Sequence, residues 1–187
     1  MITDILLAAH EQIADRPLDE KVERLAVVQE ALTWLGTPYH HAARVRGAGV
    51  DCGMFLAEVY EGAGVMPHVE PDAYPHDWHM HQDAERYLGL VQQHARQVET
   101  PLPGDIVLYR FGKCISHGAI VTAWPQIVHS YIRQGVVLDE GERNTVLREA
   151  QAGFWSPWPQ WGAVPDGSDL QPGTMAIPAD LAERMHR

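Results

Sequence analysis

A cysteine at the head of an apolar segment is the residue best placed to do chemistry in this chain. Cys52 follows Asp51, and the apolar side chains after it recur at helical spacing: Phe55, Leu56, Val59 and Tyr60. Asp51 is a residue type that caps helix N-termini. A sulfur at a helix start lies at the positive end of the helix dipole, which favours the thiolate over the thiol. The pattern predicts an activated cysteine nucleophile.

Two histidines further along the chain could supply the other groups that such a nucleophile needs. His117 lies in Ser116-His117-Gly118 at the start of a hydrophobic segment, and His129 lies on what we predict to be the next strand. A thiol, an imidazole base and a polar group that orients the base form a nucleophilic triad. We expect Cys52 to form a thioester and His117 to protonate the leaving amine and then activate water. The backbone N–H of Cys52 is the expected oxyanion donor.

The relative position of the two histidines depends on the hairpin that joins their strands. A turn through residues 122–124 places His117 opposite His129 on the same face of the sheet. A turn centred on Trp124-Pro125 offsets them by three residues, which puts the orienting role of His129 in doubt. Proline is common in turns, so the residues alone leave both registers open.

Helical patterns dominate the first half of the chain. Residues 1–16 predict a short helix, and a stronger one is expected from Asp19 to Leu35, with an apolar stripe of Val22, Leu25, Val28, Leu32 and Leu35. The Cys52 helix comes next, after a glycine-punctuated loop at residues 44–49. A further helix is predicted from about Met80 to Gln97.

The second half of the chain changes to an alternating, strand-like pattern. Successive strands of an antiparallel meander are predicted at residues 104–109, 117–123, 126–132 and 135–138. Helices followed by strands indicate an α+β fold. We divide the chain into an N-terminal helical extension (1–18), a catalytic domain (19–164) that holds an insert or lid with its helix (66–100), and a linker with a C-terminal tail (165–187).

Composition excludes several classes of protein. The chain has 187 residues and a formal net charge of −11, which argues against nucleic acid as a partner and against simple adhesion to an anionic cell wall. Two cysteines do not make a disulfide framework. No segment has the length of apolar residues that a membrane span needs, and the N-terminus lacks the basic region of a signal peptide. We therefore expect cytoplasmic synthesis.

Five short motifs, taken in order, carry a family resemblance. Residues 35–39, 50–53, 103–109, 116–121 and 127–130 closely resemble the ordered motifs of the NlpC/P60 family, papain-like cysteine peptidases of bacterial cell walls. The resemblance implies a cysteine-bearing helix packed on a small antiparallel sheet that carries both histidines. Residues 77–81 and the helix after them are similar to inserts of the phage and prophage tail-associated branch, which implies a virion or phage-tail setting and phage-tail proteins as partners.

The resemblance also assigns roles to individual residues. It implies Cys52 as nucleophile, His117 as general base and His129 as the third member, and it favours the first of the two hairpin registers. Tyr39 matches a tyrosine near the thiol and the oxyanion site. We expect the substrate to be contacted by Asp51, Gly53, Ser116, Trp78 and His79.

Two departures from the family pattern affect the expected site. Gly53 stands where serine is usual, and His41-Ala42-Ala43 replaces an aromatic-Gly-Gly sequence, which changes the expected substrate groove. No wall-binding module is recognisable either. Activity is therefore expected to depend on another protein for delivery.

Other reactive side chains have structural interpretations. Cys114 matches no motif and is interpreted as a structural residue in a loop. Asp105 is interpreted as a turn residue that opens a strand. Phe154, Trp155, Trp158 and Trp161 could stack on sugars, but packing of the C-terminal chain over the sheet is preferred. His68, His76, His79 and His81 lack the carboxylate or cysteine that would complete a metal site, so we expect a solvated lid, no metal and no cofactor.

These features predict a cysteine endopeptidase of the papain-like type. The resemblance implies hydrolysis of a peptide or isopeptide bond in peptidoglycan stem peptides, between D-glutamate and the diamino acid. An amidase or acyltransferase could use the same thiol and imidazole on a different acyl group, since fold does not select among these reactions. A catalytically weak structural component of a phage tail is the alternative outside enzymes.

Overall fold

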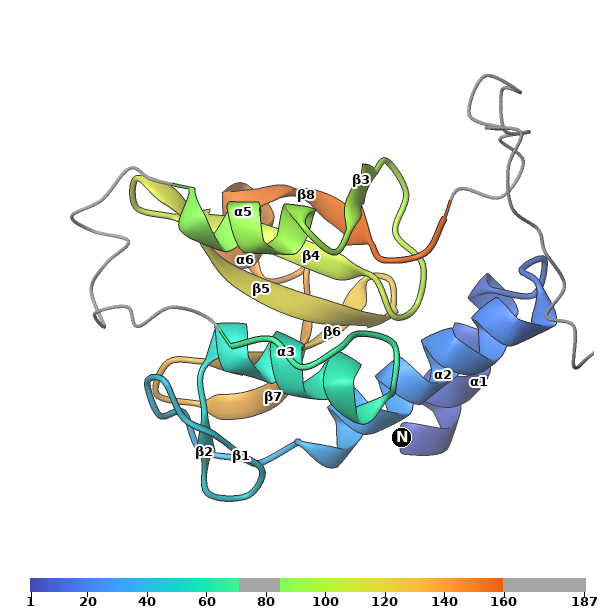
Figure 1. Ribbon diagram of the computed structural model, residues 1–187, viewed down its shortest axis with the longest axis horizontal. Helices are drawn as coiled ribbons and strands as arrows, with labels where there is room; N and C mark the ends of the chain where they lie inside the picture. Colours follow the sequence, from blue (N-terminus) through green and yellow to red (C-terminus); the bar gives the residue numbers. More distant parts are fainter. Residues whose placement is uncertain (71–84, 160–187) are drawn as a thin grey trace, which may run out of the picture.

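In the computed structural model, which describes residues 1–70 and 85–159, helices in the first part of the chain precede an antiparallel sheet. The helices are α1 (Ile2–Gln12), α2 (Leu18–Thr33) and α3 (Cys52–Gly62), and Figure 1 shows them grouped beside one face of the sheet. A two-stranded hairpin, β1 (Arg44–Val45) and β2 (Gly49–Val50), leads into α3. The predicted α+β class is confirmed.

The main sheet has six strands in the order β3-β8-β4-β5-β6-β7. Its centre is the predicted meander, observed as β4 (Ile106–Phe111), β5 (Cys114–Ala123), β6 (Gln126–Tyr131) and β7 (Gly135–Glu140). The sheet continues on the other side of β4 through β8 (Gln151–Ser156) and β3 (Arg96–Val98), which sequence patterning did not predict. A short helix, α6 (Thr145–Ala150), connects β7 to β8.

Both faces of the sheet are covered, so its strands lack a simple buried–exposed alternation. Ile106 and Leu108 pack with α2 and α3 in the larger core, whereas Val107 and Tyr109 pack with Leu147 of α6 in a smaller one. Strands buried on both faces read as continuous apolar runs. This arrangement explains why β4 and β5 are almost entirely buried.

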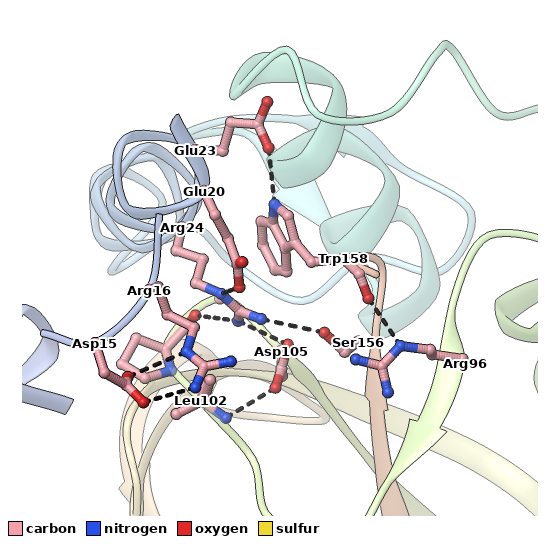
Figure 2. Close-up of polar contacts among 12 residues, drawn as sticks. Asp15, Arg16, Glu20, Glu23, Arg24, Arg96, Leu102, Asp105, Ser156 and Trp158 are labelled. Carbon is pink, nitrogen blue, oxygen red and sulfur yellow. Dashed lines mark hydrogen bonds and ion pairs between the residues drawn. The ribbon is translucent and has the colours of Figure 1, made fainter. Parts of the chain in front are cut away.

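The buried face of α2 differs from the predicted stripe because it contains a charged pair. Val22 is exposed, while Glu20 and Arg24 are buried. Arg24 donates to Glu20 at 2.6 Å and to Asp105 at 2.9 Å, as Figure 2 shows. Its guanidinium also lies 4.0 Å from the ring centroid of Trp158. This cluster joins α2 to the start of β4 and to the segment after β8.

Asp105 has the structural role that the sequence predicted. Its Oδ2 accepts a hydrogen bond from the backbone N–H of Leu102 at 2.8 Å, which closes the turn before β4. Burial raises the pKa of Asp105, and the nearby Arg24 opposes that rise. The carboxylate of Asp105 therefore stabilises the turn and the ion pair with Arg24.

The C-terminal aromatic residues are structural too, but their placement corrects the prediction. Phe154 and Trp155 belong to β8 and lie within the sheet, on opposite faces, instead of covering it. Trp158 is buried and its indole N–H donates to Glu23 at 2.8 Å. Trp161 lies outside the described residues.

The helix predicted from Met80 to Gln97 is shorter than expected at its end. It is observed as α5 (Arg86–Gln92), and the chain then enters β3, where Arg96 pairs with Ser156. Pairing with a distant strand overrides the local helical pattern. Residues 71–84, in the predicted insert, and residues 160–187, which include the predicted linker and tail, lie outside the described residues.

Candidate active site

Cys52 is the first residue of α3, as predicted. Asp51 is the N-cap, and its Oδ1 accepts a hydrogen bond from the backbone N–H of Met54 at 2.9 Å. The apolar face of α3 is buried against the sheet, including Phe55 and Val59. This packing fixes the helix start, and with it the sulfur, beside β5.

The sulfur lies next to the strand that carries the predicted base. Sγ of Cys52 donates to the carbonyl of Ser116 at 3.6 Å, one residue before His117. The hydroxyl of Tyr87, from α5, donates to the Cys52 carbonyl at 3.3 Å. Ser116 directs its own hydroxyl to the carbonyl of Phe111 at 3.1 Å. The thiol is thus held between α5 and β5.

The two histidines form a buried, directly bonded pair. Nε2 of His117 and Nδ1 of His129 are 2.9 Å apart, and the side chains are almost inaccessible. Tyr109, Phe111 and Tyr131 surround the His117 ring with centroid separations of 5.5 to 5.7 Å. Because Nε2 of His117 faces His129, only Nδ1 of that ring remains to act on a thiol.

The hairpin register corrects both sequence alternatives. The turn does centre on Trp124 and Pro125, since Ala123 pairs with Gln126, but the register then shifts so that Val121 pairs with Ile127. The irregularity falls at Thr122, where an extra residue on β5 changes the offset from three to two. An even offset keeps His117 and His129 on one face as diagonal neighbours. The expectation that they lie directly opposite each other was wrong.

A cavity of about 620 Å³ brings the predicted residues together. Its lining includes the expected site residues Tyr39, Asp51, Cys52, Gly53, Ser116 and His117. His129 does not line the cavity and stands behind His117 instead. Trp78 and His79 lie outside the described residues. The Cys52 thiol and the His117 imidazole therefore line one cavity that a substrate could enter.

The expected activation of the thiol by the helix dipole was wrong. The pKa of Cys52 is raised to about 12, first by burial and then by the negative charge of Asp51. Backbone N–H groups of Cys52, Gly118 and Gly53 act in the opposite direction but do not prevail. Burial, followed by the neighbouring His129, lowers the pKa of His117 well below its ordinary value. The resting site therefore holds a neutral thiol and a neutral imidazole.

Tyr39 reaches the cavity from a segment bridged to Val50. Burial raises the pKa of its phenol, and the negative charges of Asp51 and of Cys52 in its thiolate form add to the effect. The hydroxyl therefore stays protonated at neutral pH and can donate a hydrogen bond. A protonated phenol beside the sulfur suits the stabilisation of a developing oxyanion.

Asp51 also holds the loop in which the sequence departs from the family pattern. Its Oδ2 accepts from the backbone N–H of Ala42 at 2.7 Å and lies 3.6 Å from Nδ1 of His41. Ala42 has φ of 55°, a left-handed conformation that glycine adopts more easily. The hydrogen bond to Asp51 helps to keep alanine in this conformation, next to the substrate cavity.

The other candidate groups stand apart from this site. Cys114 is buried at the first position of β5, so the predicted loop placement was wrong. His68 lies at the surface, where its ring nitrogens contact Glu61 at 2.8 Å and Glu70 at 3.2 Å. Within residues 1–70 and 85–159, no three His, Cys, Asp or Glu side chains are grouped so as to hold a metal ion. His76, His79 and His81 lie outside that range.

Sequence reasoning missed two contributors to the site. Tyr87 lines the cavity from α5, and Asp139 lies behind the histidine pair on β7, with Oδ2 3.6 Å from Nε2 of His129. The detectable signal for Asp139 was its position one residue beyond the strand predicted at residues 135–138. The described helices include none that is long and apolar enough to cross a membrane.

The sequence profile of the NlpC/P60 family matches residues 36–157, which is well over half of the chain. The matched range contains the cysteine helix, both histidine strands and Tyr39. The chain therefore belongs to the NlpC/P60 family, whose members are generally peptidoglycan hydrolases that act as cysteine peptidases or amidases. No curated protein sequence matches the chain.

Solved structures of this family share the fold. An NlpC/P60 family protein from Bacillus cereus has a TM-score of 0.54 at 20% identity, over 73% of this chain and 40% of its own. A lipoprotein-like NLP/P60 family protein from Staphylococcus aureus has a TM-score of 0.53 at 16% identity, over 74% of this chain and 42% of its own. NlpC2 from Trichomonas vaginalis has a TM-score of 0.51 at 15% identity, over 72% and 48%. The chain thus spans less than half the length of each.

Proposed function

We propose that this protein is a cysteine endopeptidase that cleaves peptidoglycan stem peptides, at the peptide or isopeptide bond between D-glutamate and the diamino acid. The observation that carries the proposal is the shared cavity. Cys52 at the start of α3 lines it together with His117, whose Nε2 is bonded to His129. Family membership supports the choice of a cell-wall peptide as substrate.

Catalysis would begin with proton transfer inside a neutral pair. The thiol pKa of about 12 means that a free thiolate is scarce at neutral pH. Nδ1 of His117 would accept the proton as Sγ attacks the substrate carbonyl, so base catalysis and bond formation are coupled. The imidazolium would then protonate the leaving amine. The resulting thioester would be hydrolysed by water that His117 activates.

Two donors are placed for the oxyanion that forms during attack. The backbone N–H of Cys52 belongs to the first turn of α3, where N–H groups lack partners within the helix. The protonated hydroxyl of Tyr39 lines the same cavity. Loss of one such donor typically costs about 10²- to 10³-fold in kcat.

The cavity also has polar groups suited to a stem peptide. Arg86 of α5 lines it, as do the imidazoles of His41 and His94. A guanidinium is a good partner for the free carboxylates that D-glutamate and diamino acids carry. We therefore expect Arg86 to contribute to substrate binding.

An amidase or acyltransferase is the second candidate, and the apolar part of the cavity favours it. Apolar side chains line this part, among them Leu56, Met66, Leu90, Val91 and Ile132. Apolar lining matches a hydrocarbon acyl group better than a charged stem peptide. The same thiol and imidazole could transfer such an acyl group through a thioester.

One incubation separates these functions. Purified protein would be incubated with defined tetrapeptide muropeptides and, separately, with acyl amides and lipids, and the products would be identified by mass spectrometry. Muropeptide fragments formed by the wild type but not by Cys52→Ala would support the endopeptidase and identify the bond. Turnover of acyl substrates alone would favour the second candidate. Cys114→Ala is the matched control, since Cys114 is buried in β5.

The phage-tail setting would rest on residues 77–81, which lie outside the described residues. If a folded protein turns over neither substrate class, a structural role without turnover becomes the better interpretation. Such a result would contradict the proposed enzyme.

A further inference from the structure

The carboxylate of Asp139 lies on the other side of His129 from His117, the predicted base. Val137 of β7 is the register partner of His129, and Asp139 follows two residues later on the same face. Oδ2 of Asp139 is 3.6 Å from Nε2 of His129. This Nε2 is buried and has no hydrogen-bond partner among the described residues, so Asp139 is the acidic group nearest to it.

Other contacts hold the carboxylate in its ionised form. Nδ2 of Asn144 donates to Oδ2 at 2.7 Å, and the backbone N–H of Glu140 donates to Oδ1 at 2.7 Å. The pKa of Asp139 is lowered to about 2, first by the His129 ring and then, among the other groups that lower it, by Asn144. At neutral pH both oxygens of Asp139 can therefore only accept hydrogen bonds.

Few other groups face His129, and none of them competes with Asp139. The His117 ring lies on one side, and the Tyr131 ring lies at a centroid distance of 5.2 Å. Tyr109, from β4, is uncharged because burial and then the charge of Asp139 raise its pKa. Among the described residues, Asp139 is thus the charged group that acts on Nε2 of His129.

The contacts from Asp139 through His129 to His117 determine which ring nitrogens carry a proton. A carboxylate beside Nε2 of His129 favours a proton on that nitrogen, which leaves Nδ1 of a neutral ring as an acceptor. The 2.9 Å contact then requires His117 to donate from Nε2. The remaining nitrogen of His117, Nδ1, is left without a proton and can accept one from Cys52.

We propose that Asp139 is a positioning residue that sets the tautomers of both histidines, so that the nitrogen of His117 available to Cys52 is unprotonated. The inference rests on the proposed function, because it assigns His117 as the base for the Cys52 thiol. Asp139 itself does not line the cavity and acts only through His129. Asn144, which caps α6 through Val146 and Leu147, couples that helix to the carboxylate.

The direct test is ¹⁵N NMR of the histidine rings, which distinguishes protonated from unprotonated ring nitrogens without any substrate. His117→Gln and His129→Gln would assign the signals. At neutral pH we expect Nε2 of both rings to carry the proton in the wild type. A proton on Nδ1 of His117 would overturn the proposal, whether or not any variant folds.

Asp139→Asn tests the cause. The amide has nearly the shape of the carboxylate but carries no negative charge, so it no longer favours a proton on Nε2 of His129. We expect the two tautomers to reverse or mix. Glu140→Gln is the matched control, because it removes one charge from the neighbouring position, where the side chain contacts Arg143 at 3.2 Å. Unchanged tautomers in a folded Asp139→Asn protein would overturn the proposal.

Kinetics give a second readout. Asp139→Asn should lower kcat by about tenfold or more with little change in KM, since the orienting carboxylate of a triad contributes up to about 10⁴-fold. A change in KM alone would contradict a positioning role. If the wild type has the expected tautomers but cleaves no muropeptide, the proposed function fails while the assignment of Asp139 stands.

Discussion

Asp51 and Cys52 are neighbours with opposing effects on the same sulfur. The carboxylate of Asp51 caps α3 through the Met54 N–H at 2.9 Å, and so fixes the position of the thiol at the helix start. Its negative charge is also the second-largest cause of the raised pKa of Cys52. The Asp51 side chain therefore holds the nucleophile in position and at the same time opposes its ionisation.

Asp51→Asn should make Cys52 ionise at lower pH. Asparagine is also a good N-cap, so its oxygen can keep the Met54 contact while the charge is removed. Its N–H₂ group cannot accept from the Ala42 N–H, so that contact is lost. Because the wild-type pKa is about 12, the rate of alkylation by iodoacetamide should rise with pH through the alkaline range. In the variant this curve should move to lower pH, giving faster alkylation at any fixed pH below 12.

Mass spectrometry of the Cys52 peptide measures this rate directly. Glu58→Gln is the control, since it removes a charge further along α3 that is paired with Arg44 at 2.6 Å. An unshifted curve in Asp51→Asn would show that burial alone sets the pKa.

Substitutions in the triad should differ in severity. Cys52→Ala and His117→Ala are expected to lower turnover of muropeptides by at least about 10³-fold, because each removes a group that bonds to or takes a proton from the reacting atoms. His129→Ala should retain more activity, since it only orients the base. Initial rates over a range of substrate concentrations measure all three. Full activity in Cys52→Ala would rule out the mechanism.

Arg24→Met should destabilise the protein strongly. The substitution leaves Glu20 and Asp105 buried without their shared cation, a change that typically costs about 3–5 kcal/mol of unfolding free energy. Urea denaturation followed by tryptophan fluorescence measures the loss. Arg16→Met is the matched control, because its ion pair with Asp15 is at the surface and should matter by less than about 1 kcal/mol. Equal effects of the two would contradict the importance of the buried cluster.

Gly118→Ala should disturb the site through packing. A Cβ there would lie 2.7 Å from the Tyr87 hydroxyl and 2.9 Å from Cδ1 of Leu56, so these two side chains would have to move. Overpacking of this kind costs about 1–3 kcal/mol. Turnover should fall with thermal stability. Gly89→Ala, where a Cβ meets nothing within 4 Å, should not lower the thermal stability.

Local signals in the sequence were enough to predict the start of the Cys52 helix and the four central strands. A cap, an apolar face and alternating segments act over a few residues, and the fold follows them. The strand at residues 151–156 escaped prediction because its identity depends on pairing with Ile106 and Val107, about fifty residues earlier. Pairing between segments so far apart produces no periodic pattern in the local sequence.

The details of the site depended on features of the same nonlocal kind. The extra residue at Thr122 changes which residues of β5 and β6 are opposite each other, and a threonine is not a residue type that predicts such an irregularity. The ionisation of Cys52 was misjudged because the helix position was visible but the burial around the sulfur was not. Asp139 was missed because its proximity to His129 arises from the register of β6 and β7.

The protonated resting state of Cys52 has a consequence for the survival of the protein under oxidising conditions. Peroxides convert cysteine to sulfenic acid by reaction with the thiolate, so the rate follows the ionised fraction. With a thiol pKa of about 12, that fraction is very small at neutral pH. The same burial that delays attack on a substrate therefore protects the sulfur from oxidants while the cavity is empty.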